Sequence, residues 1–141
     1  MRLIQTVNCS ILLSALLSTV LLAQPALAKQ PLGTISEVSD GLLTVGIADE
    51  IRNNCPDISA RMFRALSYIS GIKSHAKSLG YSSDEINAYR KDEVEKAKLR
   101  ARGESYLQAN GVTRDDPQTF CTLGRAEIKK SSQIGALLKA K

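Results

Sequence analysis

Two stretches of the sequence decide the fold: "NNCPDISARMF" (residues 53–63) and "TFCTLGRAEI" (residues 119–128). Each stretch contains a cysteine that lies near one end of an expected helix. Pro56 directly follows Cys55, and a helix should end there because the residue before a proline disfavours the helical region. Cys121 lies just inside a helix that an Asp-Pro pair would start. Whether these cysteines are nucleophiles, metal ligands or the two halves of one disulfide depends on the compartment that the chain enters.

Residues 1–28 have the features of a secretory signal peptide. Arg2 provides a positive charge, residues 11–23 form an apolar run, and an Ala-Leu-Ala cleavage sequence ends at Ala28. A membrane anchor is the alternative, but it needs about 20 apolar residues and this run is shorter. We therefore predict cleavage after Ala28 and a periplasmic or secreted protein of residues 29–141, with no membrane span after cleavage.

The two cysteines that remain, Cys55 and Cys121, form an even pair in an oxidising compartment, which is typical of a disulfide. A thiol enzyme or a metal site is the alternative. The sequence has one histidine, His75, and no C-x-x-C motif, whereas a structural zinc site needs four closely spaced Cys or His ligands. We predict a structural bridge, stabilising by about 4 kcal/mol through loop entropy, and neither a metal nor a cofactor.

Hydrophobic periodicity predicts helices along most of the remaining chain. We expect an extended lead-in over residues 29–39 and a single helical domain over residues 40–141. The clearest apolar stripe runs from Ile58 through Met62 to Leu79, at steps of three and four residues, and Leu66 widens it. A capping-box sequence at Ser82 marks the start of the next helix. The expected helices span residues 40–54, 58–79, 82–110 with a break near 90–92, a fourth helix from 117, and a short helix near residue 134.

The predicted fold class is all-α, since no stretch alternates as a strand would. Cys55 ends the first helix and Cys121 lies near the start of the fourth. In an up-down-up-down arrangement these two ends share one pole, so a bridge needs no distortion. We predict a small four- to five-helix up-down bundle cross-linked by one disulfide. In the third helical region we expect an inward stripe of Ile86, Val94, Ala97, Ala101 and Leu107, and ion pairs Asp92–Lys96 and Arg100–Glu104.

The first and fourth helices carry charged residues that the bridge would bring close together. They are Asp49, Glu50, Arg52, Arg125 and Glu127. Paired carboxylates can perform acid–base catalysis. Neighbouring arginines would instead hold these carboxylates ionised in structural salt bridges, and we favour that interpretation.

A second candidate follows one border of the apolar stripe of the second helix. It comprises Arg61, Arg64, Tyr68 and His75. These side chains would form an edge that binds an anion or another ligand. The alternative is the ordinary polar margin of an amphipathic helix, which we favour.

Charge and motifs argue against several classes of function. The net charge is +5 at pH 7, but the signs alternate along residues 91–104 instead of massing positive charge, so no nucleic-acid partner is expected. The sequence has no glycine-rich phosphate loop, haem-attachment motif or catalytic-serine motif. Tryptophan is absent and aromatic residues make up 4 %, which argues against carbohydrate or single-strand stacking surfaces.

Four segments together resemble a family of small secreted bacterial proteins that is catalogued only as a domain of unknown function. They are "VGIADEIRNNCPDISARM" (45–62), "SLGYSSDEI" (78–86), "RGESYL" (102–107) and "CTLGRAEIKKSSQIGALL" (121–138). The resemblance covers nearly all of the chain after the predicted leader. It implies an exported helical domain with a two-cysteine framework, and it brings no activity, ligand or catalytic residue.

Three functions remain open. The first is a non-enzymatic periplasmic module that binds an unknown protein partner, which we favour because no catalytic constellation is found. The second is a periplasmic stress chaperone, by analogy with small acid-stress chaperones that are also exported, helical and disulfide-bonded. The third is an enzyme that uses the carboxylates of Asp49, Glu50 and Glu127, which a raised pKa in an open cleft would support. The oligomeric state is left open.

Overall fold

The computed structural model describes residues 28–141, so the predicted signal peptide lies outside the described residues except for Ala28. The elements in chain order are η1 (Leu32–Thr34), α1 (Ser36–Asn54), β1 (Ile58–Ala60), α2 (Met62–Ser78), α3 (Ser83–Lys91), α4 (Glu93–Ala109), α5 (Pro117–Lys129), α6 (Gln133–Ala136) and β2 (Leu138–Ala140). Within the described range, no helix has both the length and the apolar character needed to cross a membrane.

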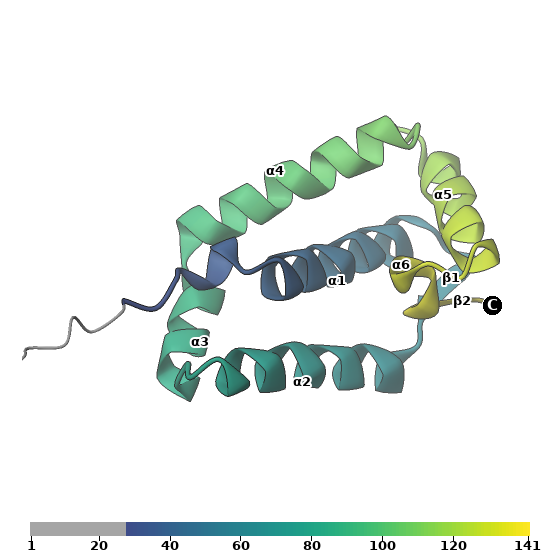
Figure 1. The fold of residues 1–141 in the computed structure, drawn as a ribbon. Helices are drawn as coiled ribbons and strands as arrows, with labels where there is room; N and C mark the ends of the chain where they lie inside the picture. The colour runs from purple at the N-terminus through teal and green to yellow at the C-terminus, as the bar shows by residue number, and fades with distance from the viewer. Residues whose placement is uncertain (1–27) are drawn as a thin grey trace, which may run out of the picture.

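Helix α1 is the centre of the fold. Helix α2 lies along one side of it and α4 along the other, while α3 lies at one end and α5 with α6 at the opposite end (Figure 1). Helix α2 runs antiparallel to α1, α4 runs in the same direction as α1, and α5 crosses the end of α1 (Figure 1). The prediction of a small helical fold with one disulfide is confirmed, with a two-stranded sheet added to it.

Buried apolar side chains form two clusters at the two ends of α1. The larger cluster lies at the disulfide end and includes Ile51, Ile58, Phe120 and Leu138, each no more than 1 % exposed. The smaller cluster lies at the α3 end and consists of Leu32, Val38, Ala76, Tyr81 and Ile86. The disulfide end is therefore the better-packed half of the domain.

The absence of strands was a wrong prediction, and so was a second helix that starts at residue 58. Strand β1 pairs antiparallel with β2, with Ile58 opposite Ala140, and α2 begins only at Met62. The side chain of Ile58 is 1 % exposed and fills the core from the strand. Because a three-residue strand is too short to show alternation, and its partner is distant in sequence, periodicity could not detect it.

The start of α1 also differs from the prediction. An extended lead-in was expected over residues 29–39, but η1 and the first turn of α1 occupy much of that range. Ile35 precedes the helix and makes no side-chain capping hydrogen bond. Burial of Leu32 and Val38 in the smaller cluster stabilises this segment instead, which is how tertiary packing commonly stabilises a helix that lacks a cap.

Local signals placed the middle helices correctly. The predicted break in the third region is confirmed, and Asp92 caps α4 through its side chain. The capping box of Ser82 and Glu85 is present at the start of α3. Gly80 and Gly111 follow α2 and α4 with φ of 88° and 77°, a left-handed backbone that glycine adopts without steric cost.

The stripe predicted for the third region is right at its two ends, where Ile86 and Leu107 are buried, and wrong between them. Val94 is 64 % exposed, and Ala97 and Ala101 are also exposed. The partly or fully buried residues of α4 include Leu99, Gly103, Tyr106 and Leu107. The predicted stripe contained only small or isolated apolar residues, so its hydrophobic signal was too weak to fix which side faces α1.

The predicted ion pairs of α4 exchange partners. Lys96 Nζ lies 2.8 Å from Glu93, while Asp92 is used as the cap. Glu104 was predicted to pair with Arg100 of α4. It lies instead 2.5 Å from Arg114, which belongs to the loop between α4 and α5. These pairs are exposed, so each contributes little to stability.

Gly124 allows α5 to lie very close to α1. A Cβ atom at this position would lie 2.7 Å from Cγ2 of Ile51 and would also contact the side chain of Ile58. Real Cβ atoms do not approach carbon atoms so closely. Glycine is therefore required for this crossing as it stands.

Candidate functional site

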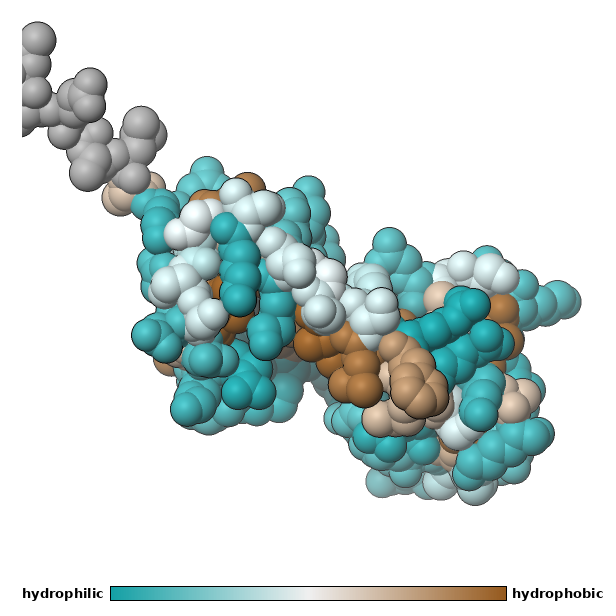
Figure 2. Space-filling model, turned by 90° about the horizontal axis from the view of Figure 1, so that it is seen from below, coloured by the Kyte–Doolittle hydropathy of each residue, from teal (hydrophilic) through white to brown (hydrophobic). Residues whose placement is uncertain are grey.

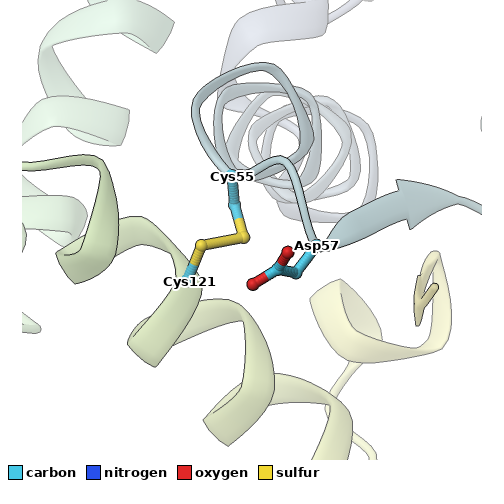
Figure 3. A group of neighbouring side chains, drawn as sticks. All are labelled: Cys55, Asp57 and Cys121. Carbon is cyan, nitrogen blue, oxygen red and sulfur yellow. A yellow bond between two sulfur atoms is a disulfide. The ribbon is translucent and has the colours of Figure 1, made fainter.

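Cys55 and Cys121 are bonded to each other, as predicted (Figure 3). Their Cα atoms are 5.1 Å apart, and both residues are buried, at 1 % and 0 % exposure. Cys55 directly follows α1, and Cys121 lies early in α5. The bond therefore joins two helix ends inside the larger core cluster, where no solute can reach the sulfur atoms.

Asp57 lies beside the bridge (Figure 3). A carboxylate oxygen of Asp57 and both sulfurs lie within 4.8 Å of one another, a spacing that three metal ligands could share. The metal-binding form of cysteine is the thiolate, and sulfurs bonded to each other in a disulfide are not thiolates. The Asp57 carboxylate lies 3.8 Å from the guanidinium of Arg125. We assign this group a structural role.

The predicted polar cluster of α1 and α5 is not brought together. Asp49 pairs with Arg52 within α1 at 2.5 Å, and Glu50 pairs with Arg114 at 2.6 Å. Arg125 is near Asp57 instead of the carboxylates of α1. Among residues 28–141, no ion pair joins members of this cluster between α1 and α5.

Glu127 is the one cluster member that is fully buried, at 0 % exposure. Tyr106 from α4 donates a hydrogen bond to it at 2.7 Å, Lys130 Nζ lies 2.6 Å away, and the Ser132 hydroxyl also donates to it. Burial acts to raise the pKa of Glu127, but hydrogen bonds from Lys130, Ser132 and Tyr106 outweigh it and hold that pKa below the ordinary value. Burial and the bond to Glu127 raise the pKa of Tyr106 to about 12. This buried carboxylate joins α4, α5 and α6.

Glu127→Gln should remove a pH-dependent part of the stability. The pKa of Glu127 is lower in the folded protein than in the unfolded chain, so its contribution is full above the unfolded value of 4.5 and is lost as the pH falls through the folded value. At pH 7 the variant should lose about 1–3 kcal/mol in free energy of unfolding, and this difference should shrink on acidification. Urea unfolding between pH 7 and pH values below 4.5 measures this difference in the free energy of unfolding. Asp115→Asn, in the exposed loop before α5, is the control, and an equal pH slope for Glu127→Gln and wild type would contradict the assignment.

A groove of about 700 Å³ lies between α1 and α4. Leu42 and Leu43 of α1 and Leu99 of α4 are among its lining residues. Arg114 and Glu50 also line it and pair with each other at 2.6 Å. The volume is in the range of small-molecule sites, but charges of both signs line it, so it selects no particular ligand chemistry.

The second predicted candidate, the four residues along one border of α2, does not act as one group. Arg61 Nε donates to the backbone oxygen of Leu138 at 2.8 Å, and Tyr68 donates to Gln133 at 2.6 Å. These two residues hold α2 against the C-terminal segment. Arg64 is exposed and His75 is half-buried. The four residues therefore do not form one anion site.

The N-terminal part of α2 exposes three large apolar side chains. Phe63 is 91 % exposed, Leu66 58 % and Met62 57 %, and we name these three residues the α2 patch. Figure 2 views the molecule from the α2 side and shows brown and tan atoms within a largely hydrophilic surface. Arg61 precedes the patch in sequence, Arg64 lies between Phe63 and Leu66, and α2 has no acidic residue. The patch is therefore an apolar surface with positive neighbours.

Residues 30–139 match the model of a family described as a family of unknown function, DUF5333. The chain belongs to this family. The match includes both cysteines and every helix of the described range, in agreement with the resemblance seen in the sequence. Comparison with curated proteins and with solved structures finds no significant match.

In this DUF5333 chain, the α2 patch is the surface that sequence analysis missed. Periodicity assigned Met62 and Leu66 to the buried side of the second helix and gave Phe63 no role. A signal was nevertheless present, because residues 61–79 contain four Lys or Arg residues and no acidic residue. A basic amphipathic helix is typical of a binding surface.

Proposed function

We propose that the protein is an exported, non-enzymatic module that binds a protein partner through the α2 patch. The observation that carries this proposal is the 91 % exposure of Phe63 beside two other exposed apolar side chains. Clustered exposure of large apolar residues is typical of interaction sites. Aromatic and arginine residues contribute most of the energy in many protein interfaces, and Arg61 and Arg64 lie beside Phe63 in sequence.

The state of the carboxylates favours binding over catalysis. Asp49 and Glu50 are each paired with an arginine. Glu127 is buried, and its pKa is lowered, whereas a general acid needs a raised pKa. These contacts support a structural use of the three candidate carboxylates over a catalytic one.

The signal-peptide pattern of residues 1–28 and the disulfide support export. The protein purified from its native compartment should begin at Lys29 and have a mass two hydrogens below that of the fully reduced chain. Intact-mass spectrometry with and without reductant measures both features. A different first residue would contradict the cleavage site, and two reactive thiols in the native protein would contradict the bridge.

Capture of a partner should depend on Phe63. Tagged wild-type protein should retain a protein from the periplasmic extract of its own cells, and Phe63→Ser should lose most of it, because the substitution removes the largest exposed apolar side chain of the patch. Val94→Ser is the matched control, since Val94 is 64 % exposed on α4, away from α2. The captured protein is then purified and its binding measured by titration calorimetry.

Phe63→Ser and Val94→Ser have opposite expected effects on partner binding. Saturable binding of the purified partner to wild type and to Val94→Ser, with at least about a tenfold loss for Phe63→Ser, supports the proposed function. Equal binding of all three proteins, or no retained partner, contradicts it. Circular dichroism should show equal helicity for all three, because both substituted side chains are solvent-exposed.

A further inference from the structure

We propose that the partner presents an acidic amphipathic helix, which lies along the outer side of α2 with Phe63 as its apolar anchor. This inference rests on the proposed function and adds the chemistry of the partner. Two observations carry it: the α2 patch at the start of the helix, and the basic side chains that continue along the helix from it.

The charge of α2 identifies the complementary chemistry. Arg64, Lys73 and Lys77 are exposed, and none of them takes part in an ion pair within the described residues. The helix has no acidic residue of its own. Complementary charges around an apolar contact guide the approach and set the alignment of two helices. A partner that fits this surface therefore carries carboxylates on both sides of an apolar stripe.

The outer side of α2 gives a second helix room to approach. Beyond Phe63, it consists of small exposed residues: Ser67, Ser70, Gly71, Ser74 and Ser78. A Cβ atom added at Gly71 would meet no atom within 4 Å. In Figure 2, pale atoms extend from the brown and tan patch across this side of the molecule. Short side chains reduce the distance between packed helices, so a helix could contact Phe63 and reach the basic residues together.

Two other occupants fit the surface less well. A second copy of the chain, packed through the same side of α2, would bring the basic residues of the two copies close together: Arg64, Lys73 and Lys77. Like charges repel, so this pairing is disfavoured. An anionic bilayer would attract these residues, but only Phe63 and its two apolar neighbours would enter the lipid, because the rest of the outer side is serine and glycine. The acidic helix satisfies both the charge and the shape.

The test uses a labelled helical peptide of four heptads as the probe, with leucine at the core positions and glutamate at the flanking positions. A matched probe has glutamine in place of each glutamate, and a third has lysine. Fluorescence anisotropy should give a tenfold or greater preference of the protein for the glutamate probe over the glutamine probe. Raising NaCl from about 50 to about 500 mM should abolish that preference, because exposed charges are screened.

Three variants examine the surface itself. Phe63→Ala should weaken binding of the glutamate probe about tenfold or more, and Val94→Ala should leave it unchanged. The triple variant Arg64→Glu, Lys73→Glu, Lys77→Glu should bind the lysine probe in preference to the glutamate probe. All three side chains are exposed, so the variant should keep wild-type helicity. Equal affinity of wild type for the glutamate and glutamine probes, no binding of either, or an unchanged preference in the triple variant would overturn the inference.

Vesicles and sedimentation test the other occupants. Binding to vesicles of three parts phosphatidylcholine to one part phosphatidylglycerol that requires Phe63, without binding of the glutamate probe, would overturn the inference in favour of a membrane surface. A Phe63-dependent dimer in sedimentation velocity would overturn it in favour of a second copy. A native partner that depends on Phe63 but tolerates the triple charge reversal would leave the proposed function standing and remove the acidic helix. Binding of the glutamate probe without any native partner would contradict the proposed function and leave the preference for an acidic helix standing.

Discussion

Replacing both cysteines, as Cys55→Ala with Cys121→Ala, should lower the free energy of unfolding by about 4 kcal/mol. The bond links positions separated by 66 residues, so its loss releases a long loop in the unfolded chain. A small domain has about 5–15 kcal/mol in total, and the variant should therefore melt far below wild type while it remains folded in the cold. Circular dichroism of thermal and urea unfolding, without reductant, measures the change.

Reduced wild-type protein is the control for the double variant. Wild-type protein that is unfolded, reduced with a phosphine and refolded in the presence of that reductant should show nearly the same loss of stability, because both proteins then lack the cross-link. Binding of the partner should survive in every sample that remains folded, since the buried sulfurs lie in the core and not on the α2 patch. A double variant that is as stable as wild type but captures no partner would contradict the structural assignment and indicate thiol chemistry.

Gly124→Leu should be the most damaging single substitution among those considered. Even the Cβ atom alone would lie 2.7 Å from a carbon of Ile51, and the Ile58 side chain also blocks the site. Ile51 and Ile58 are 0 % and 1 % exposed, so neither can move aside without disturbing the core. Overpacking of a core commonly costs about 1–3 kcal/mol, and here we expect about 3 kcal/mol or more. Differential scanning calorimetry measures the shift in melting temperature.

Ala101→Leu is the matched control for that substitution. It adds the same side chain to another helix, but Ala101 is exposed at the groove between α1 and α4, where a longer side chain has room. Leucine has good helix propensity, so the melting temperature should change by only a few degrees. Equal melting temperatures for the two leucine variants would show that α1 and α5 do not cross closely at Gly124.

The parts of the fold that sequence predicted are those with strong local causes. Proline after Cys55 ends a helix through steric exclusion, and Ser82 with Glu85 caps one through two reciprocal hydrogen bonds. Gly80 and Gly111 take left-handed backbone conformations. The disulfide was predictable because the number of cysteines and the expected compartment left few alternatives.

The parts that sequence missed depend on contacts between distant segments. Ile58 belongs to an apolar series with a helical period, yet pairing with β2 makes it part of a strand. Val94 continues an apolar series on α4, yet that side of the helix faces solvent. In both cases tertiary packing overrode the preference that local periodicity indicated.

The candidate site was harder to predict than the fold. The expected bridge between the first and fourth helices placed five charged residues together, but each has a partner outside that group or within its own helix: Asp49, Glu50, Arg52, Arg125 and Glu127. Met62 and Leu66 of the α2 patch were assigned to the core, because an apolar residue in a periodic series is more often buried than exposed. Only the packed structure distinguishes the apolar side of α2 that α1 covers from the side that it leaves open.

The pairing of β1 with β2 has a consequence for the order in which the protein can fold. Strand β1 and α1 are synthesised early, but their partners Phe120, Cys121 and Leu138 follow much later. Until residues 138–140 have been synthesised, Ile58 has no strand to pair with and the core stays open. Contacts this distant in sequence slow folding. The growing chain should therefore stay unfolded for most of its synthesis, which is the state in which a polypeptide can be threaded through a narrow protein-conducting channel.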